Sequence, residues 1–140
     1  MRIEPLVLAT LVTVAPLLAC KGAKKVSECN AFIERVNTGI KEVESATKGD
    51  DPASFEKAAG AYDKLGADVG AMSFDTPELK AHAASYKAMC DSAAKTLREV
   101  SAALAKEDIK AATDAQGNFA TLEKQENELV AKVNGFCTGQ

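Results

Sequence analysis

The sequence predicts an all-α protein in which an antiparallel, up-down-up-down four-helix bundle follows an N-terminal leader. Four consecutive segments place apolar residues at alternating spacings of three and four, which is typical of helices with one buried face. The chain is rich in Ala, Glu and Lys, lacks Trp and shows no alternation of β-branched residues, and such a composition favours helices. The connections between the segments are short, and short connections make neighbouring helices antiparallel.

Residues 1–19 have the pattern of a targeting leader. Arg2 and Glu4 lie in a short polar start, and residues 6–19 carry no charge. This apolar run is shorter than the roughly 20 residues that a membrane-spanning helix needs, so we interpret it as the core of a signal peptide. Pro16 disfavours helix near its end and helps to present an extended segment to a peptidase.

The segment Leu17-Leu18-Ala19-Cys20 resembles the lipobox of bacterial lipoproteins. The resemblance implies cleavage before Cys20, diacylglycerol on the cysteine sulfur and an acyl group on its amine. The chain would then divide into a signal peptide (1–19), a lipidated cysteine with its tether (20–27) and a bundle domain (28–138). Because two or more acyl chains hold a protein stably on a membrane, the expected partner is membrane lipid. An ordinary secretory leader that leaves Cys20 as a thiol is the alternative.

The resemblance also implies a location. Lys21, and not Asp, follows Cys20, which fits sorting to an outer membrane where the cell has one. The protein is therefore expected on the cell membrane or the outer membrane, facing the periplasm or the cell surface. The tether lysines, Lys21, Lys24 and Lys25, either contact anionic headgroups, at about 1 kcal/mol each at best, or form part of a solvated linker.

The charge of the chain argues against nucleic-acid binding. The formal net charge is −3, and the leader removes one basic and one acidic side chain, so the mature chain keeps the same value. A nucleic-acid-binding domain would show a clustered basic excess.

The first helix is expected over residues 27–47. Ser27 is its predicted cap, and Glu28 lies in its first turn, where a negative charge is favourable. Gly49 follows the helix end. The apolar face comprises Val26, Cys29, Ile33, Val36, Ile40, Val43 and Thr47.

The second helix is expected to begin at Asp51 and Pro52, a capping side chain followed by a proline at the first helical position. Three glycines, at positions 60, 66 and 70, lie off its apolar face. Each costs about 1 kcal/mol relative to alanine, so this helix is expected to be the least stable, and a three-helix arrangement without it is the main alternative fold. Its apolar face comprises Phe55, Ala58, Tyr62, Leu65, Val69 and Met72.

The third helix is expected from Pro77, after a turn over residues 73–75 and a cap at Thr76, to about Ala105. Its apolar face is unbroken and comprises Leu79, Ala83, Tyr86, Cys90, Ala93, Leu97, Val100 and Leu104.

The fourth helix is expected to be capped by Asp108 and to end at Asn134 and Gly135. Gly117 weakens it locally, and Glu126 interrupts its apolar face. The face comprises Ala112, Ala115, Phe119, Leu122, Leu129, Val133 and Phe136.

Unequal helix lengths predict a possible contact surface. The third and fourth helices exceed the first two by about eight to ten residues, or about 12–15 Å. With the anchored ends in register, a hairpin over residues 98–115 would project at the far pole and expose Val100, Leu104 and Ile109. Exposed apolar stripes of this kind tend to be contact surfaces. Alternatively, the two helices of the hairpin cover each other.

The bundle topology also predicts a disulfide. Cys29 opens the first helix and Cys137 follows the fourth, so both lie at the anchored pole, whereas Cys90 lies about 20 Å along the third helix. Since disulfides need Cα atoms within about 7 Å, we expect a Cys29–Cys137 bond. Cys90 is expected to be a buried thiol that packs as a small apolar group; a redox or intermolecular role is the alternative.

Few residues indicate chemistry. His82, the only histidine, could ligate haem with Met72 or Met89, but there is no CxxCH motif, and the cysteines are too dispersed for a zinc site. Glu126 could be a buried acid–base group; we expect instead that it reaches solvent or pairs with Lys124 or Lys132.

The sequence therefore predicts a membrane-anchored lipoprotein without enzymatic activity, cofactor or metal, acting as an interaction or structural module that has an envelope protein as a possible partner. A helical bundle that binds haem or another small ligand is the alternative.

Overall fold

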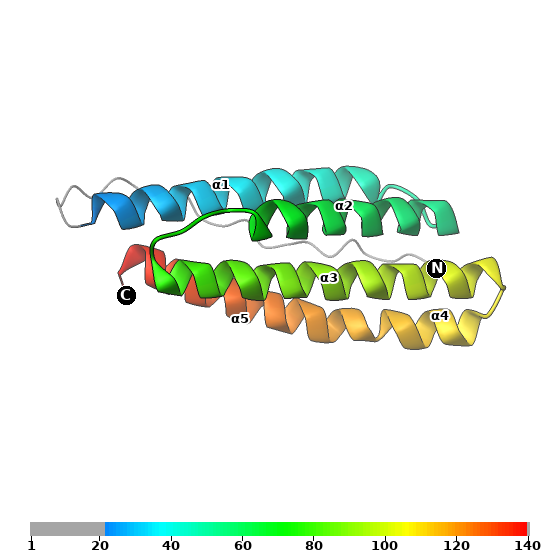
Figure 1. Cartoon of the computed structure of the whole chain (residues 1–140). Helices are drawn as coiled ribbons and strands as arrows, with labels where there is room; N and C mark the ends of the chain where they lie inside the picture. The colour runs from blue at the N-terminus through cyan, green and yellow to red at the C-terminus, as the bar shows by residue number, and fades with distance from the viewer. Residues whose placement is uncertain (1–21, 140) are drawn as a thin grey trace.

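The computed structural model describes residues 22–139, and the predicted leader and Cys20 lie outside this range. Within it, the secondary structure consists of helices and loops (Figure 1). The helices, in chain order, are α1 (Ala23–Ala46), α2 (Pro52–Gly70), α3 (Pro77–Ala105), α4 (Ile109–Gln116) and α5 (Asn118–Thr138).

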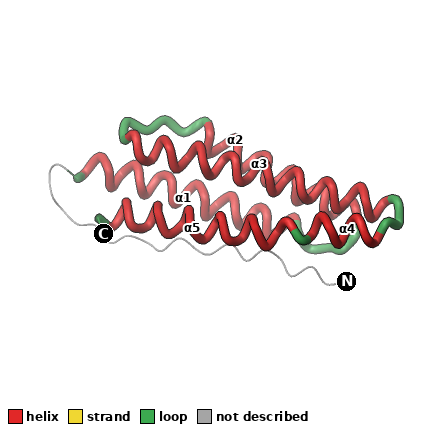
Figure 2. Tube along the Cα trace, turned by 90° about the horizontal axis from the view of Figure 1, so that it is seen from below, coloured by secondary structure: helices red, strands yellow, loops and turns green. Residues whose placement is uncertain are grey.

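The helices form the predicted antiparallel bundle, in which α4 and α5 together make the fourth rod. The most extensive packing is between α2 and α3; α1 packs mainly on α2, and α4 and α5 pack on α3. Contacts between α1 and α5, which would close the bundle, are sparse. Figure 2 shows the α3–α4 turn at one pole and the C-terminus at the other.

Two predicted helix starts are confirmed. The Asp51 carboxylate accepts a hydrogen bond from the backbone N–H of Ser54 at 3.1 Å, and Pro52 is the first residue of α2. The Asp108 carboxylate accepts one from the N–H of Ala111 at 2.9 Å. Each side chain satisfies a backbone donor that lacks a partner within its helix.

The outer ends of the bundle differ from the prediction. α1 begins at Ala23, so Ser27 lies inside the helix and does not cap it, and Lys24 and Lys25 belong to the first turn and not to a tether. α5 continues through Asn134 and Gly135 to Thr138. It ends where Gly139 adopts a left-handed conformation with φ of 76°, which glycine reaches without steric cost.

The predicted fourth helix is divided at Gly117, where α4 ends and α5 begins. The Gly117 N–H still bonds to the carbonyl of Thr113 at 3.1 Å, so the chain continues in nearly the same direction (Figure 1). Glycine stabilises a helix interior least among residues other than proline, which explains the position of the interruption.

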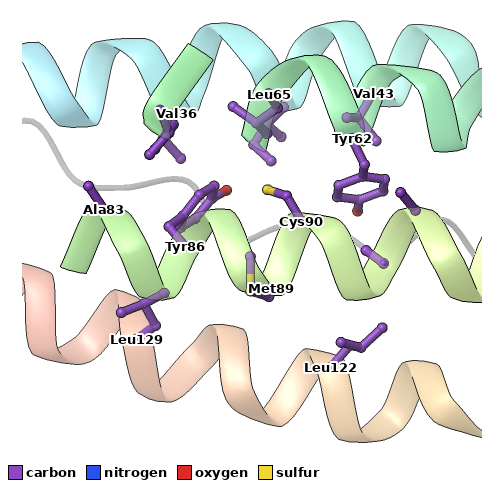
Figure 3. Close-up of a cluster of buried hydrophobic side chains, with 14 of the residues drawn as sticks. Val36, Val43, Tyr62, Leu65, Ala83, Tyr86, Met89, Cys90, Leu122 and Leu129 are labelled. Atoms are coloured by element: carbon purple, nitrogen blue, oxygen red, sulfur yellow. The ribbon is translucent and has the colours of Figure 1, made fainter. Parts of the chain in front are cut away.

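Most of the apolar residues predicted from spacing form one continuous core (Figure 3). Met72, Leu104, Ala115, Phe119 and Phe136 lie at its margin and are half-buried. Phe32, which the spacing did not select, is fully buried and packs edge-to-face on Phe74 and Tyr86, with ring centroids 6.0 Å apart in each pair.

Two glycines permit close approach between helices. A Cβ added at Gly39 would overlap the Leu65 side chain of α2, and one at Gly66 would lie 3.1 Å from the Cβ of Cys90 in α3. Gly66 is therefore buried in the α2–α3 interface and not off the packed face as predicted. The missing side chains explain how α2 packs closely on both neighbours.

Candidate functional site

The disulfide between Cys29 and Cys137 joins the start of α1 to the end of α5, with Cα atoms 5.9 Å apart. This confirms the predicted pair and places both ends of the bundle at one pole. Cys90 is a buried free thiol, and burial raises its pKa to about 12. Because the thiolate is the reactive form, Cys90 acts as a packing residue at neutral pH.

Two basic side chains, those of Lys25 and His82, pack on the ring of Phe136, which precedes the disulfide-bonded Cys137. The Lys25 ammonium lies 4.2 Å above the centre of this ring, a cation–π geometry. The His82 ring meets the same phenylalanine edge-to-face at 6.0 Å. Burial, and then the charge of Lys132, lower the pKa of His82. Of the other residues considered for haem, Met89 is buried in the core and Met72 is half-buried at its margin.

Glu28 connects α1 to the loop before α3, at the same pole. Its carboxylate accepts hydrogen bonds from the backbone N–H of Asp75 at 2.8 Å and from that of Thr76 at 3.2 Å. The Thr76 hydroxyl also donates to it. The sequence pattern predicts for Glu28 only a place in the first turn of its own helix. The topology, which brings the 73–75 turn to this pole, was the one signal that could have suggested the contact.

The most unusual side chain of the core is Glu126. It lies on the buried face of α5, one turn from both Leu122 and Leu129, and is 3% exposed. The prediction that it reaches solvent or pairs with Lys124 or Lys132 is wrong. No hydrogen bond or ion pair joins its carboxyl to another residue in the 22–139 range.

Three further polar groups share the interior with Glu126. The charge of the glutamate acts on Tyr62 of α2 and on Tyr86 and Cys90 of α3, and raises the pKa of each, although burial is the larger cause. The Tyr86 hydroxyl is buried without a hydrogen-bond partner among the residues that the structure places. Figure 3 shows both tyrosines and the thiol between α2 and α3, with Leu122 and Leu129 facing them from α5.

Burial raises the pKa of the Glu126 carboxyl to about 7, and the nearby charge of Glu123 contributes in the same direction. An unpaired carboxylate is costly in an apolar interior, and the group avoids that cost by holding its proton. Glu126 therefore exchanges a proton close to neutral pH inside the bundle.

The projecting tip is shorter than predicted. Arg98 pairs with Glu56 and Asp63 of α2, and the Ser101 hydroxyl donates to the Pro52 carbonyl at 2.8 Å. α2 thus covers α3 as far as Ser101, and the last turn of α3 and the turn to α4 extend beyond it (Figures 1 and 2).

The three residues predicted for the contact surface occupy different environments. Val100 is 1% exposed and belongs to the core, so it cannot contribute to an exposed surface. Leu104 is half-buried against the core, whereas Ile109, at the start of α4, is 58% exposed. The tip therefore presents Ile109 with the edge of Leu104.

The described helices include none long and apolar enough to cross a membrane. Residues 22–139 also contain no group of three His, Cys, Asp or Glu side chains arranged to hold a metal ion. Comparisons of the chain with protein-family models, with curated proteins and with solved structures found no match.

Proposed function

We propose that the protein is a lipid-anchored bacterial envelope protein whose helical bundle is a non-catalytic interaction or structural module. The observation that carries the proposal is the apolar leader that ends in Leu17-Leu18-Ala19-Cys20. In this proposal Cys20 is acylated and holds the chain on the cell membrane or the outer membrane, because two or more acyl chains give stable attachment.

The disulfide supports an extracytoplasmic location. Cys29 and Cys137 are bonded, and disulfides persist in the periplasm and at cell surfaces but are rare in the cytosol. Because Cys29 lies close to Cys20 in the chain, the same bond fastens the end of α5 near the proposed anchor.

A non-catalytic role is supported by how the chemistry-bearing side chains are used. His82 packs on Phe136, Cys90 lies in the α2–α3 interface, and Cys29 is consumed in the disulfide. Each has a structural task that explains its presence without a reaction.

The tip around Ile109 is the proposed contact surface for an envelope partner. It lies at the opposite pole from the start of α1 (Figure 1). α3 contains 29 residues, which corresponds to about 43 Å at 1.5 Å per residue. An anchor at Cys20 would therefore present the tip at that distance from the membrane-proximal pole.

The anchor is tested by metabolic labelling with a fatty-acid analogue in a bacterial host. We expect label in the wild-type protein and in Cys90→Ala, and none in Cys20→Ala. Label that survives the Cys20 substitution, or an acyl-free chain in the aqueous fraction of wild-type cells, would refute the anchor.

The contact surface is tested by crosslinking in intact cells. Ile109→Glu is expected to reduce capture of a specific envelope protein, whereas Ala102→Glu, which adds the same charge at another exposed site near the tip, is expected to leave it unchanged. Equal capture by both variants would show that the tip is not the contact.

A further inference from the structure

The attachment of α5 is uneven along its length. At its end, the Cys137 disulfide fixes it to α1, and at its start Gly117 separates it from α4. Between these points α5 packs mainly on α3, and its packing against α1 is sparse. The middle of α5 is thus held in the bundle mainly by its packing on α3.

Glu126 lies in this middle section. Its neighbours on the buried face, Leu122 and Leu129, pack into the core, while its own carboxyl has no hydrogen-bond or ion-pair partner within residues 22–139. A neutral carboxyl packs there at moderate cost, but a carboxylate needs water or a cation.

Among residues 22–139, the titratable groups whose pKa responds to the charge of Glu126, or whose charge acts on it, include no cation. From α2 there is Tyr62, from α3 there are Tyr86 and Cys90, and from α5 itself there is Glu123. The residues that α1 buries do not titrate: they are Phe32, Ile33, Val36, Gly39, Ile40, Val43 and the disulfide-bonded Cys29.

We propose that protonation of Glu126 controls the docking of α5 on α3, so that the bundle is closed when this carboxyl is neutral and opens along α5 when it ionises. Opening moves the middle of α5 outward, with Gly117 as the hinge and the Cys29–Cys137 bond as the fixed point. The carboxylate then reaches water, and Leu122 and Leu129 separate from α3. The release of one proton balances the step.

Amide hydrogen exchange of the full chain with its disulfide intact tests this device. Rates are corrected for intrinsic exchange and compared at about pH 5.5 and about pH 8.5, on either side of the Glu126 transition. We expect opening of residues 120–131 to increase about tenfold or more in wild-type protein, with little change in the α2–α3 interface.

Matched variants separate Glu126 from other groups. Glu126→Gln removes the charge with little change of shape and should abolish the dependence on pH, whereas Glu123→Gln should retain most of it. His82→Gln serves as a second control, because His82 is titratable, has a lowered pKa and packs on Phe136 of α5; this variant should also retain the effect. A dependence that persists in Glu126→Gln would overturn the proposal.

Carbon-13 NMR titration of the Glu126 carboxyl supplies a readout that needs no variant. The expected midpoint is near neutral pH and coincides with chemical-shift changes at Leu122 and Leu129. A midpoint in the range of an ordinary glutamate, or a titration that leaves both leucines unchanged, would refute the mechanism.

Discussion

Glu28 of α1 accepts hydrogen bonds from both the backbone N–H and the hydroxyl of Thr76, the residue that precedes α3. The N–H of Thr76 lies at a helix start, where backbone donors have no partner within the helix. A side chain 48 positions away in sequence satisfies this donor, whereas the Thr76 side chain makes no capping hydrogen bond to the first turn of α3.

Removing this contact should destabilise the bundle. Glu28→Ala is expected to lower the free energy of unfolding by about 1–2 kcal/mol, since it removes a charged acceptor from a helix start. Urea denaturation measures the change. Glu34→Ala removes an exposed charge from the same helix and should cost much less; equal losses would contradict a stabilising role for this contact.

The disulfide should make a large contribution to stability. It closes a loop with a sequence separation of 108, and replacing both Cys29 and Cys137 by serine is expected to cost about 4–5 kcal/mol in the chain-entropy account. Reducing agent should shift the denaturation midpoint of the wild-type protein and leave that of the double variant unchanged. A midpoint insensitive to reduction in both proteins would mean that the bond does not stabilise the fold.

Two glycines of α2 should respond in opposite directions. Gly60 is exposed and a Cβ there would meet nothing within 4 Å, so Gly60→Ala is expected to stabilise the protein by about 0.5–1 kcal/mol. At Gly66 the added Cβ would press on Cys90, so Gly66→Ala should destabilise it. Thermal melts of the two variants provide the comparison. If both variants are more stable than wild type, the α2–α3 interface accommodates a methyl group at position 66 without strain.

Glu126 should make the protein less stable as pH rises. Its pKa is raised from 4.5 to about 7 in the folded state. Between these values the folded state holds a proton that the unfolded state releases, so the free energy of unfolding decreases with pH across this window. Below about pH 4.5 both states are protonated and above about pH 7 both are ionised, so the contribution is constant outside it. The total decrease is about 3 kcal/mol at about 1.4 kcal/mol per pKa unit.

Denaturant midpoints between about pH 4.5 and about pH 8 check this slope. Glu126→Gln should remove most of it. His82 acts in the opposite sense. Its pKa is lowered from 6.5 in the folded state, so its contribution to the free energy of unfolding increases as pH rises from the lowered pKa to 6.5. A denaturation midpoint that increases with pH in both the wild-type protein and Glu123→Gln would contradict a buried Glu126 with a raised pKa.

Much of the fold could be predicted because helix starts and buried faces are local properties. Asp51 with Pro52, and Asp108 before its helix, are capping signals that act within one turn. The disulfide followed from topology: an even number of antiparallel helices places Cys29 and Cys137 at one pole. The resemblance at Cys20 lies outside residues 22–139 and stays a prediction.

The sequence could not predict the burial of side chains that a neighbouring helix covers. The spacing that made Glu126 an interruption of the α5 face equally allowed an outward or an inward side chain. Likewise, Val100 has the same spacing pattern whether α2 reaches it or not, and only the packed position of Pro52 beside Ser101 shows that it is covered.

The sequence by itself determined four amphipathic rods, their order and the pair of cysteines that joins the first to the last, because the period of apolar residues and the short turns act along the chain. The tertiary structure alone decided that Glu28 accepts a hydrogen bond from the N–H of Thr76, that Gly66 brings α2 against Cys90 and that Glu126 is buried with no hydrogen-bond or ion-pair partner among residues 22–139. These three depend on distances between side chains of different helices, and burial and hydrogen bonding are set by those distances and not by the local pattern.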